Sequence, residues 1–253
     1  MNVSGKVAIV SGGGSGLGAA TARLLAEQGA KVAVIDLNLS AAEAVASEID
    51  GLAVSGNVTS EEEVSTALDH IEATLGIPQI VVNCAGIGTA KRILGRDQVH
   101  PLADFSRVID VNLIGSFNLL RLSAERIAKA EPDDNNERGV IVLTSSIAAY
   151  DGQVGQIAYA ASKGGINAIT LPAARELAQF GIRVLTIAPG LFKTPLMEEL
   201  PEAVQQSLGE SIPFPKRLGK PQEFAQMALH CAENSFLNGE VIRLDGSLRM
   251  APR

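Results

Sequence analysis

The chain of 253 residues contains no tryptophan, two tyrosines, three histidines and two cysteines. Cys84 and Cys231 are far apart and no signal segment is evident, so the sequence predicts reduced thiols in a cytoplasmic protein rather than a disulfide scaffold. His70, His100 and His230 lack the spacing of metal ligands, so no metal site is expected. An apolar run begins by residue 7, so no cleaved targeting peptide is expected.

Basic residues and long apolar runs are also scarce. The net charge is −7 and the basic residues form no stripe, so nucleic acid is not an expected partner. No apolar stretch reaches the roughly 20 residues that a membrane helix needs, so no membrane partner is expected either. What the chain has in abundance is Ala, Val, Ile and Leu, within a hydrophobic fraction of 46%. This composition suits parallel strands that are covered by helices on both faces.

Strand-like and helical patterns alternate along almost the whole chain. Runs rich in β-branched residues predict a first strand that begins by residue 7. Further strands are predicted near 32–35, 52–55, 79–82, 140–143, 183–187 and 241–244. Helical spacing of apolar residues predicts a helix near 41–49 and one that begins at residue 60. Further helices are predicted near 102–130, 157–180, 195–208 and 221–232. The alternation predicts an α/β fold: a single doubly wound parallel sheet with helices on both faces, in one domain over residues 1–253.

Three local signals refine this picture. Ser60 and Glu63 fit a capping box at the start of one helix. Pro172 is expected to bend the helix near 157–180 or to cost it one hydrogen bond. The polar stretch 131–138 is short enough for a surface loop, so we do not expect a domain boundary there.

A glycine-rich turn follows the first predicted strand and leads directly into a helical pattern. Free N–H groups at a helix N-terminus, together with the helix dipole, bind phosphate, and glycines let the backbone approach it closely. Two spacings fit: Gly14-x-Gly16-x-x-Ala19, typical of dinucleotide folds in general, and Gly12-x-x-x-Gly16-x-Gly18, typical of a narrower group. Taken alone, the pattern also fits a flexible glycine loop.

The next predicted strand ends in Asp36, eighteen residues beyond Gly18. A carboxylate there can accept hydrogen bonds from both hydroxyls of an adenosine ribose and would repel a 2′-phosphate. No Arg or Lys follows in 37–39 to attract such a phosphate, so the sequence favours NAD over NADP. The alternative is that Asp36 simply begins a turn.

Tyr159 and Lys163 are four residues apart, and Ser146 precedes Tyr159 by thirteen residues. Positions i and i+4 share one face of a helix, so the phenol and the ammonium are expected to point the same way. A phenol with a pKa near ~10 needs stabilisation of its phenolate to act as a base at neutral pH, and a neighbouring lysine supplies it. With the serine hydroxyl, the group could move a proton on and off an alcohol oxygen. On its own, the Tyr–Lys pair also fits a solvated helix face.

Four further segments complete a recognisable set of motifs. Asn83-Cys84-Ala85-Gly86 has the form N-x-A-G, Asn112 follows Val111, Pro189-Gly190 ends the sixth predicted strand, and Thr194 comes shortly after. With the glycine loop, Ser146, Tyr159 and Lys163, they make the chain resemble the short-chain dehydrogenase/reductase family over essentially its whole length. Ser11 stands where that family usually has Thr, and Asn57 where it usually has Asp facing the adenine.

The resemblance implies a Rossmann fold, an NAD cofactor and a tetrad of Asn112, Ser146, Tyr159 and Lys163. Asn112 is expected to distort its helix locally and to hold a water through its carbonyl group. The implied cofactor site comprises Gly12, Ser15, Gly16, Leu17, Gly18, Asp36, Leu37, Asn57, Val58, Asn83, Ala85, Gly86, Tyr159, Lys163, Pro189, Gly190, Phe192 and Thr194.

Segments 151–156, 188–196, 213–219 and 236–246 resemble a group within the family, the type II 3-hydroxyacyl-CoA dehydrogenases. This resemblance implies a homotetramer that oxidises the 3-hydroxyl of a 3-hydroxyacyl-CoA, a small-molecule substrate. Ser146, Tyr159 and Gln153 would contact that substrate, although Gln153 fits a loop surface equally well.

Segments 87–105 and 194–217 would line the acyl pocket, since ligands bind outside the carboxyl ends of the strands. The resemblance places the last strand at a two-fold interface. Exposed apolar residues there would otherwise be an aggregation liability, so we expect the C-terminal strands to pair across that interface. The residues expected to be exposed there are Val241, Ile242, Leu244, Leu248 and Met250.

Three alternatives remain open. The same tetrad would serve a hydroxysteroid or other secondary-alcohol dehydrogenase. It would also serve a 3-oxoacyl-carrier reductase, although such enzymes usually use NADP and Asp36 argues against that. A non-catalytic NAD-binding scaffold is the third, and it would not need an intact tetrad.

Overall fold

The computed structural model describes residues 1–96, 98–198 and 200–252. Within these ranges, seven parallel strands form one sheet in the order β3-β2-β1-β4-β5-β6-β7. The strands are β1 (Val7–Ser11), β2 (Lys31–Asp36), β3 (Leu52–Ser55), β4 (Pro78–Asn83), β5 (Gly139–Thr144), β6 (Ile182–Pro189) and β7 (Val241–Leu244). The order reverses between β1 and β4, which makes this the topological switch point where doubly wound sheets bind ligands.

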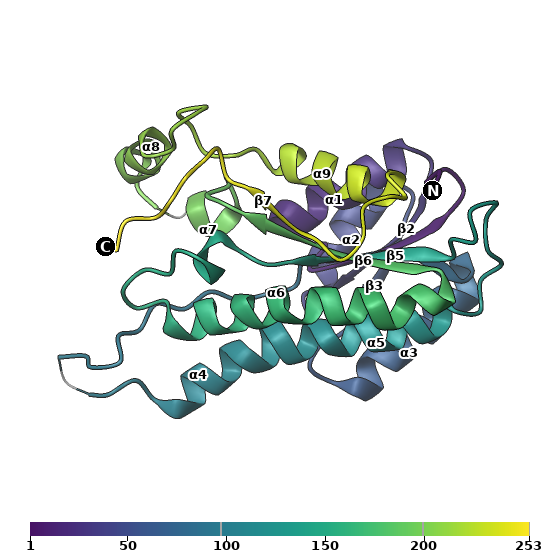
Figure 1. Cartoon of the computed structure of the whole chain (residues 1–253), viewed down its shortest axis with the longest axis horizontal. Helices are drawn as coiled ribbons and strands as arrows, with labels where there is room; N and C mark the ends of the chain where they lie inside the picture. Colours follow the sequence, from purple (N-terminus) through teal and green to yellow (C-terminus); the bar gives the residue numbers. More distant parts are fainter. Residues whose placement is uncertain (97, 199, 253) are drawn as a thin grey trace.

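Helices cover both faces of the sheet, as the composition predicts (Figure 1). Helices α1 (Gly16–Glu27), α2 (Leu39–Glu48) and α9 (Pro221–Glu233) share a core with one face. Helices α3 (Glu61–Leu75), α5 (Gly115–Ile127) and α6 (Ile157–Leu177) share a core with the other. The described part of the chain also contains α4 (Leu102–Ile109), α7 (Pro195–Glu198) and α8 (Glu202–Glu210).

Alternation along the strands divides the interior into these two cores. In β1, Ala8 and Val10 belong to the core with α1, whereas Val7 and Ile9 belong to the core with α6. Successive side chains of a strand point to opposite faces, so a sheet covered on both sides needs an apolar residue at every position. The doubly wound parallel sheet that the sequence predicts is therefore confirmed.

The predicted helix near 102–130 is interrupted by a wide π-helical turn, Asp110–Ile114, which joins α4 to α5. The predicted helix near 195–208 is wrong, because α7 ends at Glu198 and α8 begins after Pro201. Proline has no N–H and disfavours helical geometry in the residue before it. Glu199 and Asp97, which fall within two of the predicted segments, lie outside the described residues.

Two of the local signals have a definite outcome. Helix α6 continues past Pro172, which can donate no backbone hydrogen bond. Ser60 accepts a hydrogen bond from the Glu63 N–H, as a cap should. The Glu63 carboxylate, however, accepts from the N–H of Asn57 and not of Ser60, so only half of the predicted capping box forms.

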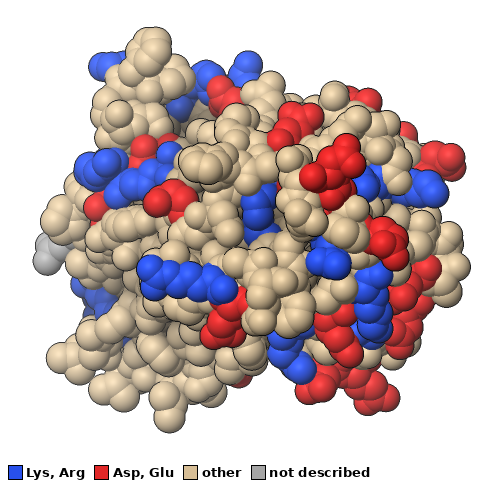
Figure 2. Space-filling model, turned by 45° about the vertical axis from the view of Figure 1, so that its right-hand side comes forward, with Lys and Arg blue, Asp and Glu red and all other residues tan. Residues whose placement is uncertain are grey.

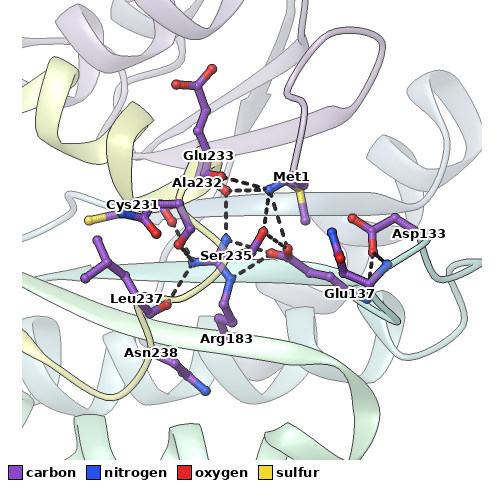
Figure 3. A network of polar contacts seen from close by, with 12 residues as sticks. Met1, Asp133, Glu137, Arg183, Cys231, Ala232, Glu233, Ser235, Leu237 and Asn238 are labelled. Atoms are coloured by element: carbon purple, nitrogen blue, oxygen red, sulfur yellow. Dashed lines mark hydrogen bonds and ion pairs between the residues drawn. The ribbon is translucent and has the colours of Figure 1, made fainter.

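A buried polar network ties β6 to the end of α9 and to the loop before β5 (Figure 3). The Arg183 guanidinium lies 2.6 Å from Glu137 Oε1 and donates to the carbonyl groups of Cys231, Ala232 and Leu237. Both charged side chains are more than nine-tenths buried. The arginine therefore supplies donors to a helix end whose last carbonyl groups have no partner inside the helix.

Acidic and basic side chains intermingle over the face in Figure 2. No helix among the described residues is long and apolar enough to cross a membrane. Within the same residues, no group of three or more His, Cys, Asp or Glu side chains is arranged to hold a metal ion.

Candidate active site

The glycine loop lies at the switch point, against the carboxyl end of β4. Gly12 has a φ of +62°, and a Cβ atom there would be 2.7 Å from the backbone nitrogen of Ala85. A Cβ atom on Gly18 would be 2.2 Å from the Gly12 carbonyl oxygen. Larger residues at these positions would force the loop and the strand apart.

The N-terminus of α1 is available to an anion. Ser15 is the N-cap residue, and its side chain makes no capping hydrogen bond. The first N–H groups of a helix have no partner inside it, so those of Gly16 and Leu17 suit a phosphate. Asp36 closes the side of this cradle: its Oδ2 accepts a 3.0 Å hydrogen bond from the Gly14 N–H. The residues present thus fit a dinucleotide.

The adenine side of the predicted site shows two surface residues and one buried one. Leu37 is 73% exposed. Asn57 uses its Oδ1 to accept hydrogen bonds from both the N–H and the hydroxyl of Thr59, so the amide oxygen that was expected to face an adenine is engaged within a turn. Val58 is buried, and its carbonyl accepts from Asn118 Nδ2.

Asn83 holds the ends of β1 and β4 together. Its Oδ1 accepts a 2.7 Å hydrogen bond from the Ser11 hydroxyl, and its Nδ2 donates to the Ser116 carbonyl. The Ser11 oxygen also accepts from the N–H of Ala85 at 3.4 Å. Ser11 stands where the family usually has threonine, and its hydroxyl thus connects the start of the glycine loop to the N-x-A-G segment.

Asn112 lies in the π turn and is fully buried, so the predicted local distortion of this helix is confirmed. Its side chain accepts from the Ile87 N–H at 2.8 Å and donates to the Ile87 carbonyl and to Ser162 Oγ. Its own carbonyl accepts a 2.6 Å hydrogen bond from the Ser116 hydroxyl. Asn112 therefore pins the segment after β4 to α6.

Helix α6 places Tyr159 and Lys163 on one face, with the Lys163 Nζ atom 5.7 Å from the centre of the Tyr159 ring. Nζ donates a 2.7 Å hydrogen bond to the carbonyl of Thr144, the last residue of β5. It also lies near Gly86, where an added Cβ atom would be 3.6 Å from it. Ser146 lies two residues beyond β5, and hydrogen bonding with its hydroxyl acts on the pKa of the Tyr159 phenol. The three predicted groups therefore meet beyond the sheet.

Burial changes the acidity of these groups. It lowers the pKa of Lys163 to about 8, because the ammonium loses its hydration shell. Burial also raises the pKa of Tyr159 above its ordinary value, while hydrogen bonding with Ser146 acts in the opposite direction. The expectation that Lys163 holds the tyrosine pKa down is therefore not met by the protein groups alone.

The nicotinamide side of the predicted site is built from the end of β6. Gly190 follows Pro189 and lies against β7, since its N–H donates to the Leu244 carbonyl. The Thr194 side chain lies beside the glycine loop, 3.6 Å from where a Cβ atom on Gly16 would be. Phe192 packs edge-on against Phe224 in the core, so it can offer a ligand little more than its backbone.

Gln153 lies in the segment between Ser146 and Tyr159. Its Nε2 donates a 2.9 Å hydrogen bond to the carbonyl of Ala251, near the C-terminus. The structure thus gives this side chain a partner that the sequence did not indicate. Leu248, expected to be exposed, is 5% exposed and packs with Ile147 and Ile212.

Sequence reasoning missed two residues of the site. The Thr144 carbonyl orients Lys163, and the only available signal was the position of Thr144 at a predicted strand end. Ser162 accepts from Asn112 and donates to the Tyr159 carbonyl, so it joins the π turn to α6 beside Tyr159. Its place next to Lys163 gave no hint of this contact, which depends on two helices packing together.

Comparisons with known proteins show the family of the chain. The sequence model of the family described as short chain dehydrogenase matches residues 6–205. The chain is 52% identical to a human 3-hydroxyacyl-CoA dehydrogenase type-2, covering 99% of this chain and 98% of the relative, and 49% identical to one from Drosophila melanogaster, covering 99% and 100%.

Among solved structures, the crystal structure of 3-hydroxyacyl-CoA dehydrogenase type-2 from Mycobacterium avium is 47% identical, covers 98% of each chain and has a TM-score of 0.95. The protein is therefore an enzyme that belongs to the short-chain dehydrogenase family.

Proposed function

We propose that this enzyme oxidises the 3-hydroxyl of a 3-hydroxyacyl-CoA to a ketone with NAD, in a reversible reaction. The observation that carries the proposal is the meeting of Ser146, Tyr159 and Lys163 beside a glycine loop bounded by Asp36. The names of relatives with about half of their residues identical support the substrate class.

The chain's own groups handle the proton. Ser146 would donate a hydrogen bond to the substrate's C3 oxygen, and Tyr159 as phenolate would take its proton as the C–H bond breaks. The nicotinamide, when bound, accepts the hydride that leaves C3. Lys163 would contribute to the ribose site and, once the cofactor is bound, would favour the phenolate by its charge. Because burial raises the pKa of Tyr159, the oxidation rate should increase with pH until the phenol ionises.

NAD rather than NADP is the proposed cofactor because of charge. The Asp36 carboxylate lies at the end of β2, beside the glycine loop, where it would repel a 2′-phosphate. Leu37, the next residue, is exposed and uncharged, so it supplies no partner for that phosphate.

The substrate would lie beyond the carboxyl ends of the strands. A cavity of about 250 Å³ near the ends of β6 and β7 is lined by apolar residues, among them Leu191, Ile212 and Leu244, and by the charged Arg217, Glu223 and Asp245. Its apolar part would suit an acyl chain. Gln153 would use its remaining amide donor or its carbonyl toward the thioester.

One assay separates the candidate functions. Purified protein is mixed with NAD and 3-hydroxybutyryl-CoA, and NADH is followed by its ultraviolet absorbance. Formation of NADH is expected, with a steroid alcohol run in parallel and turned over more slowly. A faster steroid reaction would favour a hydroxysteroid dehydrogenase, and a preference for NADPH and a 3-oxoacyl carrier would favour a reductase. Tight NAD binding without turnover of any of these substrates would favour the non-catalytic NAD-binding scaffold.

We also propose that residues 1–253 act as one catalytic domain and assemble as a homotetramer in the cytoplasm. One sheet takes its strands from residue 7 to residue 244, and β7 lies at its edge with partly exposed side chains. Pairing of β7 with its copy would cover that edge. Light scattering tests the assembly, and a stable monomer at micromolar concentration would contradict it.

A further inference from the structure

The segment 151–156 lies between the two halves of the candidate site, because Ser146 precedes it and α6, which carries Tyr159, follows it directly. Inside the segment, the Gln153 N–H donates to Gln156 Oε1, and the Gln156 N–H donates to the Gln153 carbonyl at 3.0 Å. These two bonds shape a turn but do not tie it to the rest of the fold, so its position depends on what it contacts elsewhere. One such contact is the 2.8 Å hydrogen bond from the Lys91 N–H to the Gly155 carbonyl.

The C-terminal tail, residues 245–252, supplies two of those contacts. The Ala251 carbonyl accepts the 2.9 Å hydrogen bond from Gln153 Nε2, and the Pro252 carbonyl accepts a 3.0 Å hydrogen bond from the Val154 N–H. In Figure 1 the tail runs past the end of the sheet toward the side where α6 begins. The tail thus holds the segment by one backbone hydrogen bond and one side-chain hydrogen bond.

Arg243, on β7, connects the tail and the segment. Its guanidinium donates 2.7 Å hydrogen bonds to Asp151 Oδ2 and Asp245 Oδ2 and a 3.0 Å bond to the Leu248 carbonyl. It also lies 4.8 Å from the centre of the Tyr150 ring. Arginine suits this position because its planar fork can serve several acceptors and an aromatic face at once.

An apolar cluster lies beneath these polar contacts. Ile147, next to Ser146, packs with Ile212, beyond α8, and with Leu248 of the tail, and all three are buried. A small core, separate from the two cores of the sheet, therefore joins three parts of the chain. These are the C-terminal tail, the turn that begins at Ile147 and the chain beyond α8.

We propose that Arg243 is a positioning residue for the substrate: with the tail, it fixes segment 151–156 so that Gln153 faces the thioester. The substrate class rests on the proposed function, whereas the contact between Arg243 and the segment does not. Loosening the segment should weaken substrate binding while the proton-transferring group of Ser146, Tyr159 and Lys163 stays assembled.

The test compares Arg243→Met with Arg249→Met, a matched control. Arg249 also donates to Asp245 Oδ2, at 3.1 Å, but its side chain is 60% exposed, and its hydrogen bonds go to Asp245 and Leu248 rather than to segment 151–156. Arg243→Met should raise the KM for 3-hydroxybutyryl-CoA roughly tenfold, about the worth of one lost hydrogen bond, with kcat and the KM for NAD changed less than about threefold. Arg249→Met should leave all three near wild type, and Arg243→Lys should recover part of the loss.

Hydrogen exchange followed by mass spectrometry gives a readout that needs no substrate. The Val154 N–H should exchange faster in Arg243→Met than in wild type or Arg249→Met. If Arg243→Met does not fold, Asp151→Ala breaks the same contact from its other side and should give the same changes. A fall in kcat together with equal rises in the KM for the thioester and the KM for NAD would indicate a merely structural role and overturn the proposal.

Unchanged exchange at Val154 would also overturn it, as would faster exchange with an unchanged KM for the thioester. If wild type fails to oxidise 3-hydroxybutyryl-CoA, the proposed function fails, and the exchange comparison still decides whether Arg243 holds the segment.

Discussion

Replacing Lys163 by methionine should stabilise the fold while it destroys activity. The structure buries the Lys163 ammonium to 4% exposure, and burial lowers its pKa from 10.5 to about 8. Each pKa unit corresponds to about 1.36 kcal/mol, so keeping the lysine charged at neutral pH costs the folded state about 3 kcal/mol. Methionine has a similar length and no charge. It also gives up the hydrogen bond to the Thr144 carbonyl, worth about 1 kcal/mol.

The net expectation is a gain of about 2 kcal/mol at pH 7. For a chain of this length, that corresponds to a rise of roughly 4–8 °C in melting temperature. The sign of the pH dependence follows from the lowered pKa. As the pH rises from about 8 toward 10.5, the folded wild type loses this proton before the unfolded chain does, so the cost of burial disappears. The advantage of Lys163→Met should therefore be largest at pH 7 and shrink by pH 10.

The assay is thermal denaturation without added nucleotide, at fixed protein concentration, across this pH range. Lys31→Met is the control, because Lys31 is exposed at the start of β2 and should change stability by less than about 0.5 kcal/mol. A Lys163→Met protein that melts below wild type at pH 7 would refute the reasoning. So would an advantage that stays constant up to pH 10.

Three further substitutions test other parts of the structure. Tyr159→Phe should lower kcat by roughly 10²- to 10⁴-fold with little change in NAD affinity, and a loss below tenfold would remove the phenol from the mechanism. Asp36→Ala should reduce discrimination against NADP, more so with Leu37→Arg, as the ratio of kcat/KM values would show. Arg183→Met should cost roughly 3–5 kcal/mol in chemical denaturation because it removes the 2.6 Å ion pair of the buried Glu137 and leaves that carboxylate only the Met1 ammonium, at 3.4 Å, and the Ser235 hydroxyl. Adding Glu137→Gln should restore part of that loss.

The sequence predicted most of the sheet because its signals are local. Each strand is a short β-branched run, and the sheet buries both faces, so no tertiary contact has to override the pattern. The break between α7 and α8 was not predicted, although the sequence shows Pro201, because the apolar spacing continues across the proline. The end of a helix depends on backbone geometry that hydrophobic spacing does not report.

The candidate site was predicted to the level of residue types and not of contacts. Tyr159 and Lys163 share a helix face, so their proximity follows from spacing alone. The contact between Gln153 and Ala251 joins residues almost a hundred positions apart, and no local pattern indicates it. The raised pKa of Tyr159 likewise depends on burial, which only the packed structure sets.

The π turn at Asp110–Ile114 sets the length of the chain at this point. A π turn bonds residue i to residue i+5, as the Gly115 N–H does to the Asp110 carbonyl, so it holds one residue more than an α-helical turn. In a regular helix that extra residue would rotate everything after it by about 100°, and the buried face of α5 would turn away from the sheet. Deleting one residue here would let a regular helix keep both buried faces but would move Asn112 off Ile87 and Ser162. The extra residue therefore serves the contacts of Asn112 and not the core. Alignments or designs that treat 102–127 as an unbroken helix will assign the wrong residues to the buried face of α5.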